Sequence, residues 1–356
     1  TLGGNWGGEN FSGGTVASFT FRKKSGFFDC VTWTGNGVAG RTIAHSLGCD
    51  IGMLIIKRTN ASHDWTVYHK GLGNDIKFLK LNATSAEAIG DGALTSTTFK
   101  VNDDGWGYDT NVSGGTYVAY VFADNSSEDA EEQMIKCGSY TGIGDTDGPF
   151  VNLGWEPQFV LIKNTQRSDN WLVVDTMRGM PNVPSLLTPR VFANASTGEG
   201  ATYSICYPDS LGFKLQGQGT ANNWGGETFI YMAIRAPMMV EPEAATDVFA
   251  AVTRNSSVGG VNYYTGFPTD LSIYNALTNT TGYAHARLTA NNRLTMATTD
   301  AEISATAGDF GSNVGYQLGT SSTNTNAFTL NWKRAKGYMD VVCYSGTGSA
   351  RTVPHS

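Results

Sequence analysis

Apolar and polar residues alternate along much of the chain with a period of two, and helical periodicity is nearly absent. Such alternation predicts β-strands, with one set of side chains on a buried face and the other toward solvent or a neighbour. Only SAEAI from Ser85 and SEDAEEQM from Ser127 are compatible with a turn or two of helix. The clearest alternation, with large apolar residues at every second position, occurs in residues 17–21, 118–122, 230–234 and 328–332.

The chain also repeats itself at a period of about 100 residues, which is the size of a small domain rather than of a solenoid repeat. The pentapeptide NWGGE occurs at Asn5 and at Asn223, and a degraded copy between them has Trp106 in the tryptophan position. The segment SLGCDIGMLIIKRTNASHDWTV from Ser46 aligns without gaps on NLGWEPQFVLIKNTQRSDNWLV from Asn152. A third landmark recurs as DCVTWTGNG, KCGSYTGIG and DVVCYSGTG. Because these landmarks keep one order, we expect an array of similar domains.

Short strands separated by Gly, Asn, Asp and Ser turns predict an all-β chain built from tandem antiparallel β-sandwich modules, jelly-roll-like in character. Residues 258–305 lack both the LIIK strand and the tryptophan that follows it, so the structure of the third module is left open. The repeat register starts and stops inside a module, so we expect an ordered piece of a longer polypeptide. The expected segments are 1–25 (end of a preceding repeat), 26–124, 134–236, 247–334 (divergent) and 335–356 (start of a following repeat).

Composition narrows the possible partners. The net charge is −7 without basic clusters, which argues against nucleic acid because phosphate binding needs concentrated Lys and Arg. No apolar run is long enough to cross a bilayer, so no membrane insertion is expected. An odd number of cysteines without short CxxC spacing indicates small buried hydrophobes rather than a disulfide framework or zinc site. The five are Cys30, Cys49, Cys137, Cys206 and Cys343.

No metal or cofactor site is expected. His63 and His69 share a strand face but lie roughly 20 Å apart at about 3.3 Å per residue, too far to hold one ion. The segment DTDGP, with Asp145, Asp147 and Gly148, resembles part of a calcium loop but lacks the downstream Glu, so a turn is the better interpretation.

Enzyme chemistry also lacks support. There is no GxSxG, no HExxH and no phosphate-cradling glycine loop, so no catalytic residue is assigned. The carboxylates Asp103, Asp104 and Asp109 are compatible with a glycosidase only by composition, and they also suit a solvated loop. Lys57 and Lys163 recur at strand ends, where outward-facing charges discourage edge pairing.

The tryptophans of the Trp-Gly-Gly segments are the candidate ligand- or partner-binding residues: Trp6, Trp106 and Trp224. A tryptophan on a loop can stack on a sugar face or anchor a partner. The alternative is that each ring packs on its own sandwich while the glycines supply positive φ, and the sequence leaves both open. Trp65 and Trp171 follow polar turns and are expected in the core.

The landmarks VTWTGNGVAGRTIAHSLG, GMLIIKRTNASHDWTVYHKGL, SGGTYVAYVFAD, IKCGSYTGIG and LGWEPQFVLIKNTQRSDNWLVVDTMRGM together resemble a repeat domain of tailed-phage tail-fibre-like and other appendage virion proteins, particularly of marine phages. The resemblance covers residues 26–234 well and the third module poorly. It implies β-rich modules in a virion protein and carries over no catalytic residue.

The expected function is therefore a non-enzymatic structural component of a virion appendage, such as a tail fibre, that contributes to host attachment at the particle surface. Expected partners are other virion proteins, further copies of the chain (a homo-oligomer, with a trimer possible) and a glycan or protein on the host surface. The alternative is a secreted or cell-surface carbohydrate-binding β-sandwich module.

Overall fold

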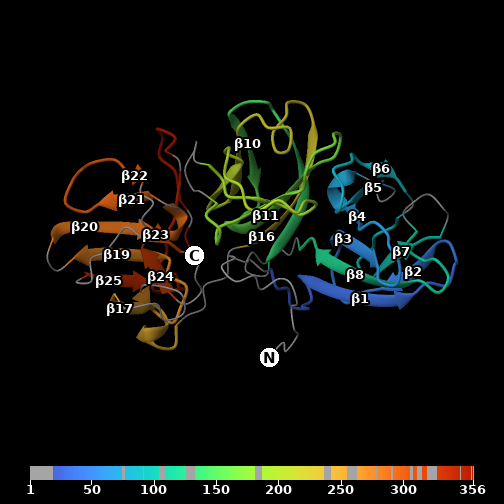
Figure 1. The fold of residues 1–356 in the computed structure, drawn as a ribbon, viewed down its shortest axis with the longest axis horizontal. Coiled ribbons are helices and arrows are strands. Elements are labelled where there is room, and N and C mark those ends of the chain that lie inside the picture. The colour runs from blue at the N-terminus through green and yellow to red at the C-terminus, as the bar shows by residue number, and fades with distance from the viewer. Residues whose placement is uncertain are drawn as a thin grey trace.

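The computed structural model shows an all-β chain in which every named strand pair is antiparallel (Figure 1). The three sandwiches are called here module 1 (26–124), module 2 (134–236) and module 3 (247–334). No helix in the part of the chain that the structure describes is long and apolar enough to cross a membrane. The described residues are 19–73, 77–90, 92–103, 109–125, 133–180, 187–235, 242–254, 263–276, 279–289, 292–304, 308–310, 315–318, 327–344, 346–353 and 355.

Module 1 contains a six-stranded sheet in the order β1-β8-β3-β4-β5-β6 and a two-stranded sheet, β2-β7. A single turn of 3-10 helix, η1, follows β4. The elements are β1 (Phe28–Thr34), β2 (Arg41–Ala44), β3 (Ile51–Arg58), β4 (Thr66–His69), η1 (Lys70–Leu72), β5 (Lys77–Lys80), β6 (Ala88–Ile89), β7 (Thr98–Val101) and β8 (Thr116–Ala123).

Module 2 has the same plan, with a five-stranded sheet in the order β13-β12-β11-β16-β9 and a three-stranded sheet in the order β10-β15-β14. Its long strands β11 and β16 pair at the centre, as β3 and β8 do in module 1. The elements are β9 (Ile135–Thr141), β10 (Asp147–Asn152), β11 (Pro157–Asn164), β12 (Leu172–Asp175), β13 (Val191–Phe192), β14 (Cys206–Asp209), β15 (Gly212–Gln216) and β16 (Thr228–Arg235).

Module 3 repeats this topology even though its sequence has diverged. Its six-stranded sheet runs β17-β25-β19-β20-β21-β22, and its second sheet runs β18-β24-β23. Strand β19, LSIYNA, takes the place that the LIIK strand β3 has in module 1, which answers the question that the sequence left open. The elements are η2 (Ala245–Asp247), β17 (Phe249–Thr253), β18 (Tyr263–Tyr264), β19 (Leu271–Ala276), β20 (Asn279–Ala286), η3 (Arg287–Thr289), β21 (Asn292–Thr295), β22 (Ile303–Ser304), β23 (Gly308–Asp309), β24 (Gly315–Leu318) and β25 (Ala327–Trp332).

The large sheet of each module has an inner face, which packs on the module's own small sheet, and an outer face on the opposite side. On the inner face of module 1, Tyr117 stacks on Trp33 at 5.2 Å, and Trp33 meets Phe99 of the small sheet edge-on at 5.6 Å. Phe213 and Tyr231 make the same kind of contact in module 2. Aromatic packing between the two sheets therefore builds each sandwich core.

The outer faces of modules 1 and 2 meet one another. One continuous hydrophobic cluster contains Phe28, Met53 and Phe122 of module 1 together with Leu161 and other residues of module 2. The large apolar residues of 118–122 and 230–234 thus point to the outer face, while smaller or aromatic partners such as Ala119 and Tyr231 fill the inner one. The module 2 residues in this shared cluster are Ile135, Cys137, Phe159, Leu161, Trp171, Val173, Ile230, Met232 and Ile234.

Three sequence interpretations change. Lys163 is not an outward-facing edge charge, because β11 is a central strand and its ammonium group is fully buried. Its Nζ donates to the carbonyl oxygens of Thr84, Asn164 and Arg167. Lys57 likewise ends a central strand, and its Nζ donates to the carbonyl of His63. Segment 85–89 is not helical and ends in strand β6, which pairs with β5.

Two other expectations can be compared with the described residues. All five cysteines are free thiols, but the expected burial holds only for Cys137 and Cys206, because Cys30, Cys49 and Cys343 are half-buried. The turn that precedes β1 recurs after β25. Lys24 and Phe28 form an isolated antiparallel β-bridge in the first turn, and Ala335 and Met339 form the same bridge in the second. Gly26 and Gly337 both have a φ of 72° in these turns. The aligned sequences GFFDCV and GYMDVV therefore adopt the same local structure.

Candidate functional site

The motif NWGGE at 223–227 forms the loop that leads into β16 at one end of module 2. Its asparagine is an anchor rather than a contact residue, because Asn223 is fully buried. The side-chain Oδ1 accepts from the backbone N–H of Ile143, and Nδ2 donates to the carbonyls of Asp145 and Gly217. One side chain thus holds three separate backbone segments together, which gives the loop a defined shape.

The glycines of the motif allow a close approach between loops. Gly226 has a φ of 80°, a conformation that favours glycine. A Cβ on the neighbouring Gly142 would lie 2.2 Å from the carbonyl oxygen of Trp224, so that position also requires glycine. The loop therefore presents Trp224 at its outer side, where the residue is 43% exposed.

Charged groups support the exposed ring of Trp224. The guanidinium of Arg167 lies 5.0 Å from the ring centroid, a cation–π distance. Arg167 also donates to both carboxylate oxygens of Glu227, with Nη2 at 2.5 Å from Oε1. Asn164 Nδ2 donates to Glu227 Oε2 at 2.6 Å. The hydrogen bond from Arg167 holds the pKa of Glu227 below its ordinary value, so the carboxylate stays charged and keeps Arg167 beneath the ring.

A cleft of about 470 Å³ adjoins this loop. Tyr203 is an exposed aromatic at its wall, and the guanidinium of Arg190 stacks 3.9 Å from its ring centroid. Two neighbouring asparagines connect the cleft to the Trp224 loop. Asn222 Nδ2 donates to the carbonyl of Gln216, and Asn223 Nδ2 donates to the carbonyl of Gly217. The cleft is lined by Thr146, Asp169, Tyr203, Ser204, Gln216, Gly217, Gln218, Gly219, Thr220 and Ala221.

Of the three candidate tryptophans, the structure describes Trp224. Trp6 and Trp106 lie outside the described residues. In module 1 the anchor is Asn111, which accepts from Asn36 N–H and donates to the Val38 carbonyl as Asn223 does at the corresponding places in module 2. The next residue, Val112, therefore holds the Trp224 position, and the expected equivalence of Trp106 with Trp224 is wrong. The sequence repeat is aligned on the tryptophans, but the structurally equivalent residues are the asparagines Asn111 and Asn223.

The expectation that His63 and His69 share a strand face is wrong, because β4 begins at Thr66 and His63 lies before it. His69 is buried, with Nε2 donating to the carbonyl of Tyr231 in module 2 and Nδ1 accepting from the N–H of Gly71. Burial lowers its pKa to about 4, so the imidazole is neutral. His63 Nδ1 lies 3.3 Å from the Asp64 carbonyl instead.

No metal-binding group of three His, Cys, Asp or Glu side chains occurs in the described ranges. Asp145 caps its own turn by accepting from the Asp147 N–H, which is the turn that the sequence predicts. Of the loop carboxylates considered for glycosidase chemistry, Asp104 lies outside the described residues. Asp103 and Asp109 are both half-buried.

Sequence reasoning missed the residues that support Trp224. Asn164 ends β11 and Arg167 lies in the turn that follows, far along the chain from Glu227, and nothing in their local pattern joins them. The one sequence signal for these residues is Glu227 at the end of NWGGE, because a glutamate on a loop of fixed shape is often paired with a cationic side chain. Tyr203 carries no motif at all.

Comparison with known proteins places this geometry in a family without assigning it an activity. No curated protein and no solved structure matches the chain. One family matches residues 3–237, a range that includes modules 1 and 2 and the loop of Trp224 and excludes module 3. The chain belongs to this family, which is described as a domain of unknown function, DUF7483.

Proposed function

We propose that this chain is a non-enzymatic structural component of a phage virion appendage, such as a tail fibre, located at the particle surface. The observation that carries the proposal is the shared hydrophobic cluster of modules 1 and 2. Tandem modules with separate cores would flex at their linkers, whereas modules that share a core form a stiff unit. A projecting appendage requires such stiffness.

Polar contacts at the same junction fix the relative orientation of the two modules. Trp171 Nε1 donates to the carbonyl of Lys80 at 2.9 Å. The N–H of Glu87 donates to the Thr165 carbonyl at 2.7 Å, and the N–H of Asp169 donates to the Thr84 carbonyl at 2.8 Å. These backbone groups would cost free energy if buried without partners, so the bonds favour one docking geometry.

The junction also depends on small residues. A Cβ on Gly71 would lie 2.7 Å from the carbonyl oxygen of Gly138, and a Cβ on Gly52 would lie 2.6 Å from the sulfur of Cys137. The two modules thus approach at backbone distance, which is typical of a permanent interface. We expect the partners to be other virion proteins and further copies of this chain, with a host glycan or protein contacted by exposed loops.

Mass spectrometry and cryo-electron microscopy of purified particles from the source phage test this function. Peptides of the chain should copurify with intact virions, and density for adjacent β modules should project from the tail or head. Recovery of the chain only from the particle-free supernatant would contradict the proposal.

Carbohydrate binding is the second candidate, favoured by the exposed ring of Trp224 beside the polar cleft of Tyr203. Sugars bind by stacking on aromatic rings and by hydrogen bonds to amides and carboxylates, and this region offers all three groups. A glycan array should show a signal that Trp224→Ala and Tyr203→Ala abolish. Phe150→Ala, which removes a similarly exposed aromatic outside the cleft, is the matched control and should leave the signal unchanged. No glycan signal, or one that survives both loop variants, would exclude this candidate.

A further inference from the structure

The outer face of module 3 is an apolar surface that the described part of the chain leaves partly exposed. Its central row runs across β17, β25, β19, β20 and β21, because these residues are direct partners in the strand registers. Ala251 and Leu294 are exposed, and the residues between them are half-buried. The row is Ala251, Leu330, Ile273, Ala284 and Leu294, and the next row begins Phe249, Trp332 and Leu271.

The corresponding rows of module 2 are buried. Cys137, Met232, Leu161 and Val173 form the central row by the same strand pairing, and all four belong to the cluster shared with module 1. The face that module 1 covers in module 2 is therefore the face that stays open in module 3. An apolar sheet face of this kind marks a protein–protein contact.

Module 1 covers module 2 with η1 and with the part of its own outer face that lies near the end of β5, and module 3 carries a counterpart of this part, called here the Leu294–Met296 edge. In module 1, Val67 pairs with Leu79, and in module 3, Ala284 pairs with Leu294. Val67 and Ala284 each lie two residues before the end of their strand, and Leu79 and Leu294 each lie one residue before the end of theirs. Leu294 thus takes the place of Leu79, and Met296 that of Leu81. Leu79 is 1% exposed, whereas Leu294 is 48% and Met296 is 57% exposed.

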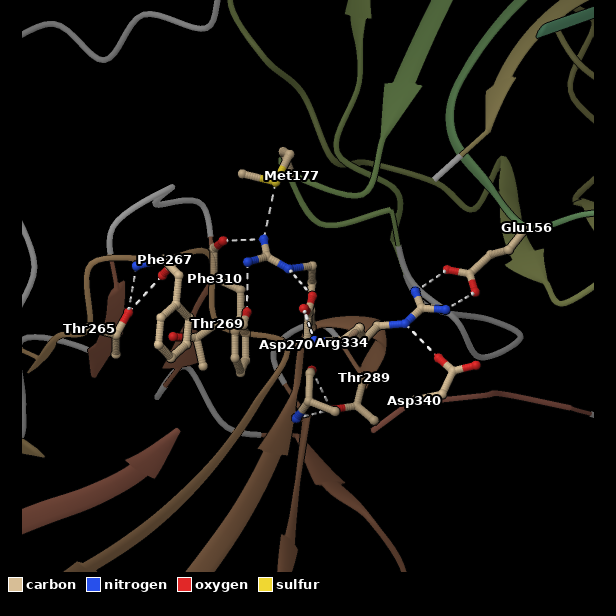
Figure 2. A network of polar contacts seen from close by, with 12 residues as sticks. Glu156, Met177, Thr265, Phe267, Thr269, Asp270, Thr289, Phe310, Arg334 and Asp340 are labelled. Atoms are coloured by element: carbon tan, nitrogen blue, oxygen red, sulfur yellow. Dashed lines mark hydrogen bonds and ion pairs between the residues drawn. The ribbon is translucent and has the colours of Figure 1, made fainter. Parts of the chain in front are cut away.

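Module 2 does not cover this surface with its own edge. Among the described residues, its polar contacts with module 3 lie beside η3 and after the end of β25 (Figure 2). Arg334 donates to both oxygens of Glu156 at 3.2 Å and to Asp340 at 2.7 Å. Arg287 Nη1 lies 3.1 Å from the sulfur of Met177. These contacts tether module 3 and leave the apolar rows of its sheet open.

We propose that two copies of this chain associate through module 3, with the Leu294–Met296 edge of one copy on the outer face of the other. Module 3 has a counterpart of the module 1 edge and a counterpart of the module 2 outer face. A second copy can therefore place its edge on the outer face of the first. Reciprocal docking gives a closed, two-fold arrangement in which each edge and each face is used once. The inference deepens the proposed function by naming the surface of self-association, and it depends on that function only for its biological setting.

Sedimentation equilibrium of the full chain at concentrations up to about 100 μM tests the inference. The wild type should have twice the mass of one chain. Ala251→Arg, which places a charge on the face, and Met296→Glu, which places one on the edge, should each weaken association at least tenfold while leaving the far-UV circular dichroism unchanged. Val38→Lys, at an exposed apolar position of module 1, is the matched control and should remain dimeric.

A wild type that stays monomeric over this range would overturn the inference, as would a dimer that both module 3 variants leave intact. Failure of the proposed function gives a different result. If these variants break the dimer but peptides of the chain are absent from virions, the self-association surface is supported and the proposed appendage function is contradicted.

Discussion

Modules 2 and 3 share one strand order and differ in what covers their outer faces. In module 2, module 1 buries the apolar rows of β11 and β16, and both sides of the large sheet lie inside the protein. In module 3 the same rows, carried by β19 and β25, remain half-exposed. The comparison teaches that one topology serves either as an internal layer or as a surface, depending on the neighbour that the chain provides.

The inner faces differ as well. In module 2 the partners Ala233 and Val160 form an apolar row, while in module 3 the corresponding row is Asn331, Ser272 and His285. Within the described part of the chain, Ser272 Oγ and both ring nitrogens of His285 are buried without a hydrogen-bond partner. Unpaired buried polar groups lower stability, so module 3 should unfold before the pair of modules 1 and 2.

The largest effect should come from removing the indole at the covered face. Trp171→Ala deletes a side chain that is almost fully buried and loses its hydrogen bond to Lys80, which should lower the free energy of unfolding by about 3–5 kcal/mol. Trp332→Ala on the open face is the matched control and should cost about 1 kcal/mol, because the ring is half-exposed. Urea denaturation of both variants measures the difference, and equal losses would erase the distinction between the faces.

Acid should act on both regions through buried histidines. Burial lowers the pKa of His69 and of His285 to about 4, compared with 6.5 in the unfolded chain. Between these values the unfolded state binds protons that the folded state does not, so stability falls as the pH falls from 6.5 to 4. Each histidine contributes up to about 3 kcal/mol to this loss.

Thermal unfolding at several pH values measures the effect. Replacing His69 with Gln should flatten the pH dependence of the unit formed by modules 1 and 2, and replacing His285 should flatten that of module 3. His355→Gln, at an exposed position, should alter neither. A pH profile that the two buried replacements leave unchanged would show that neither histidine is held neutral.

A smaller effect should follow at the close approach between modules 1 and 2. Gly71→Ala would place a Cβ 2.9 Å from the Ile230 side chain and still closer to the Gly138 backbone, which should destabilise the pair by about 1–3 kcal/mol. Gly198→Ala, where no atom lies within 4 Å, is the control and should change stability little. Chemical denaturation followed by tryptophan fluorescence reports both, and a Gly71 variant as stable as the control would rule out backbone-distance packing.

The smallest change should be a gain in module 3. Ser272→Val replaces an unpartnered buried hydroxyl with the side chain found at Val160 of module 2, and should stabilise module 3 by about 1 kcal/mol. The reverse replacement, Val160→Ser, should destabilise module 2. Differential scanning calorimetry resolves the module 3 transition, and a lower transition temperature for Ser272→Val would mean that the hydroxyl has a stabilising partner.

The sequence predicts the fold class and the repeat well, because strand alternation and turn residues are local signals. It does not identify which face of a strand is inside a module. Ile230, Met232 and Ile234 are more hydrophobic than Ala233 and its neighbours, yet they face the other module. Period two separates two faces, and only the tertiary neighbours decide what each one contacts.

The candidate site shows the same limit. Trp224 is recognisable as an exposed loop residue, but its supports Arg167 and Glu227 are joined only by the fold. An alignment on the tryptophans misplaces the loop, because the buried asparagine before the strand, Asn111 or Asn223, is the residue that holds it. Lys163 was misjudged because a lysine at a strand end usually faces solvent, and here a second module adds the Thr84 carbonyl.

Hydrogen–deuterium exchange of the full chain, followed residue by residue under mild denaturing conditions, tests the central claim most directly. Amides of β3, β8, β11 and β16 should open with one common free energy, because modules 1 and 2 share a core, and those of β19 and β25 should open separately at a lower one. If β11 and β16 instead exchange independently of β3 and β8, or together with β19 and β25, the shared core does not couple the two modules and the account fails.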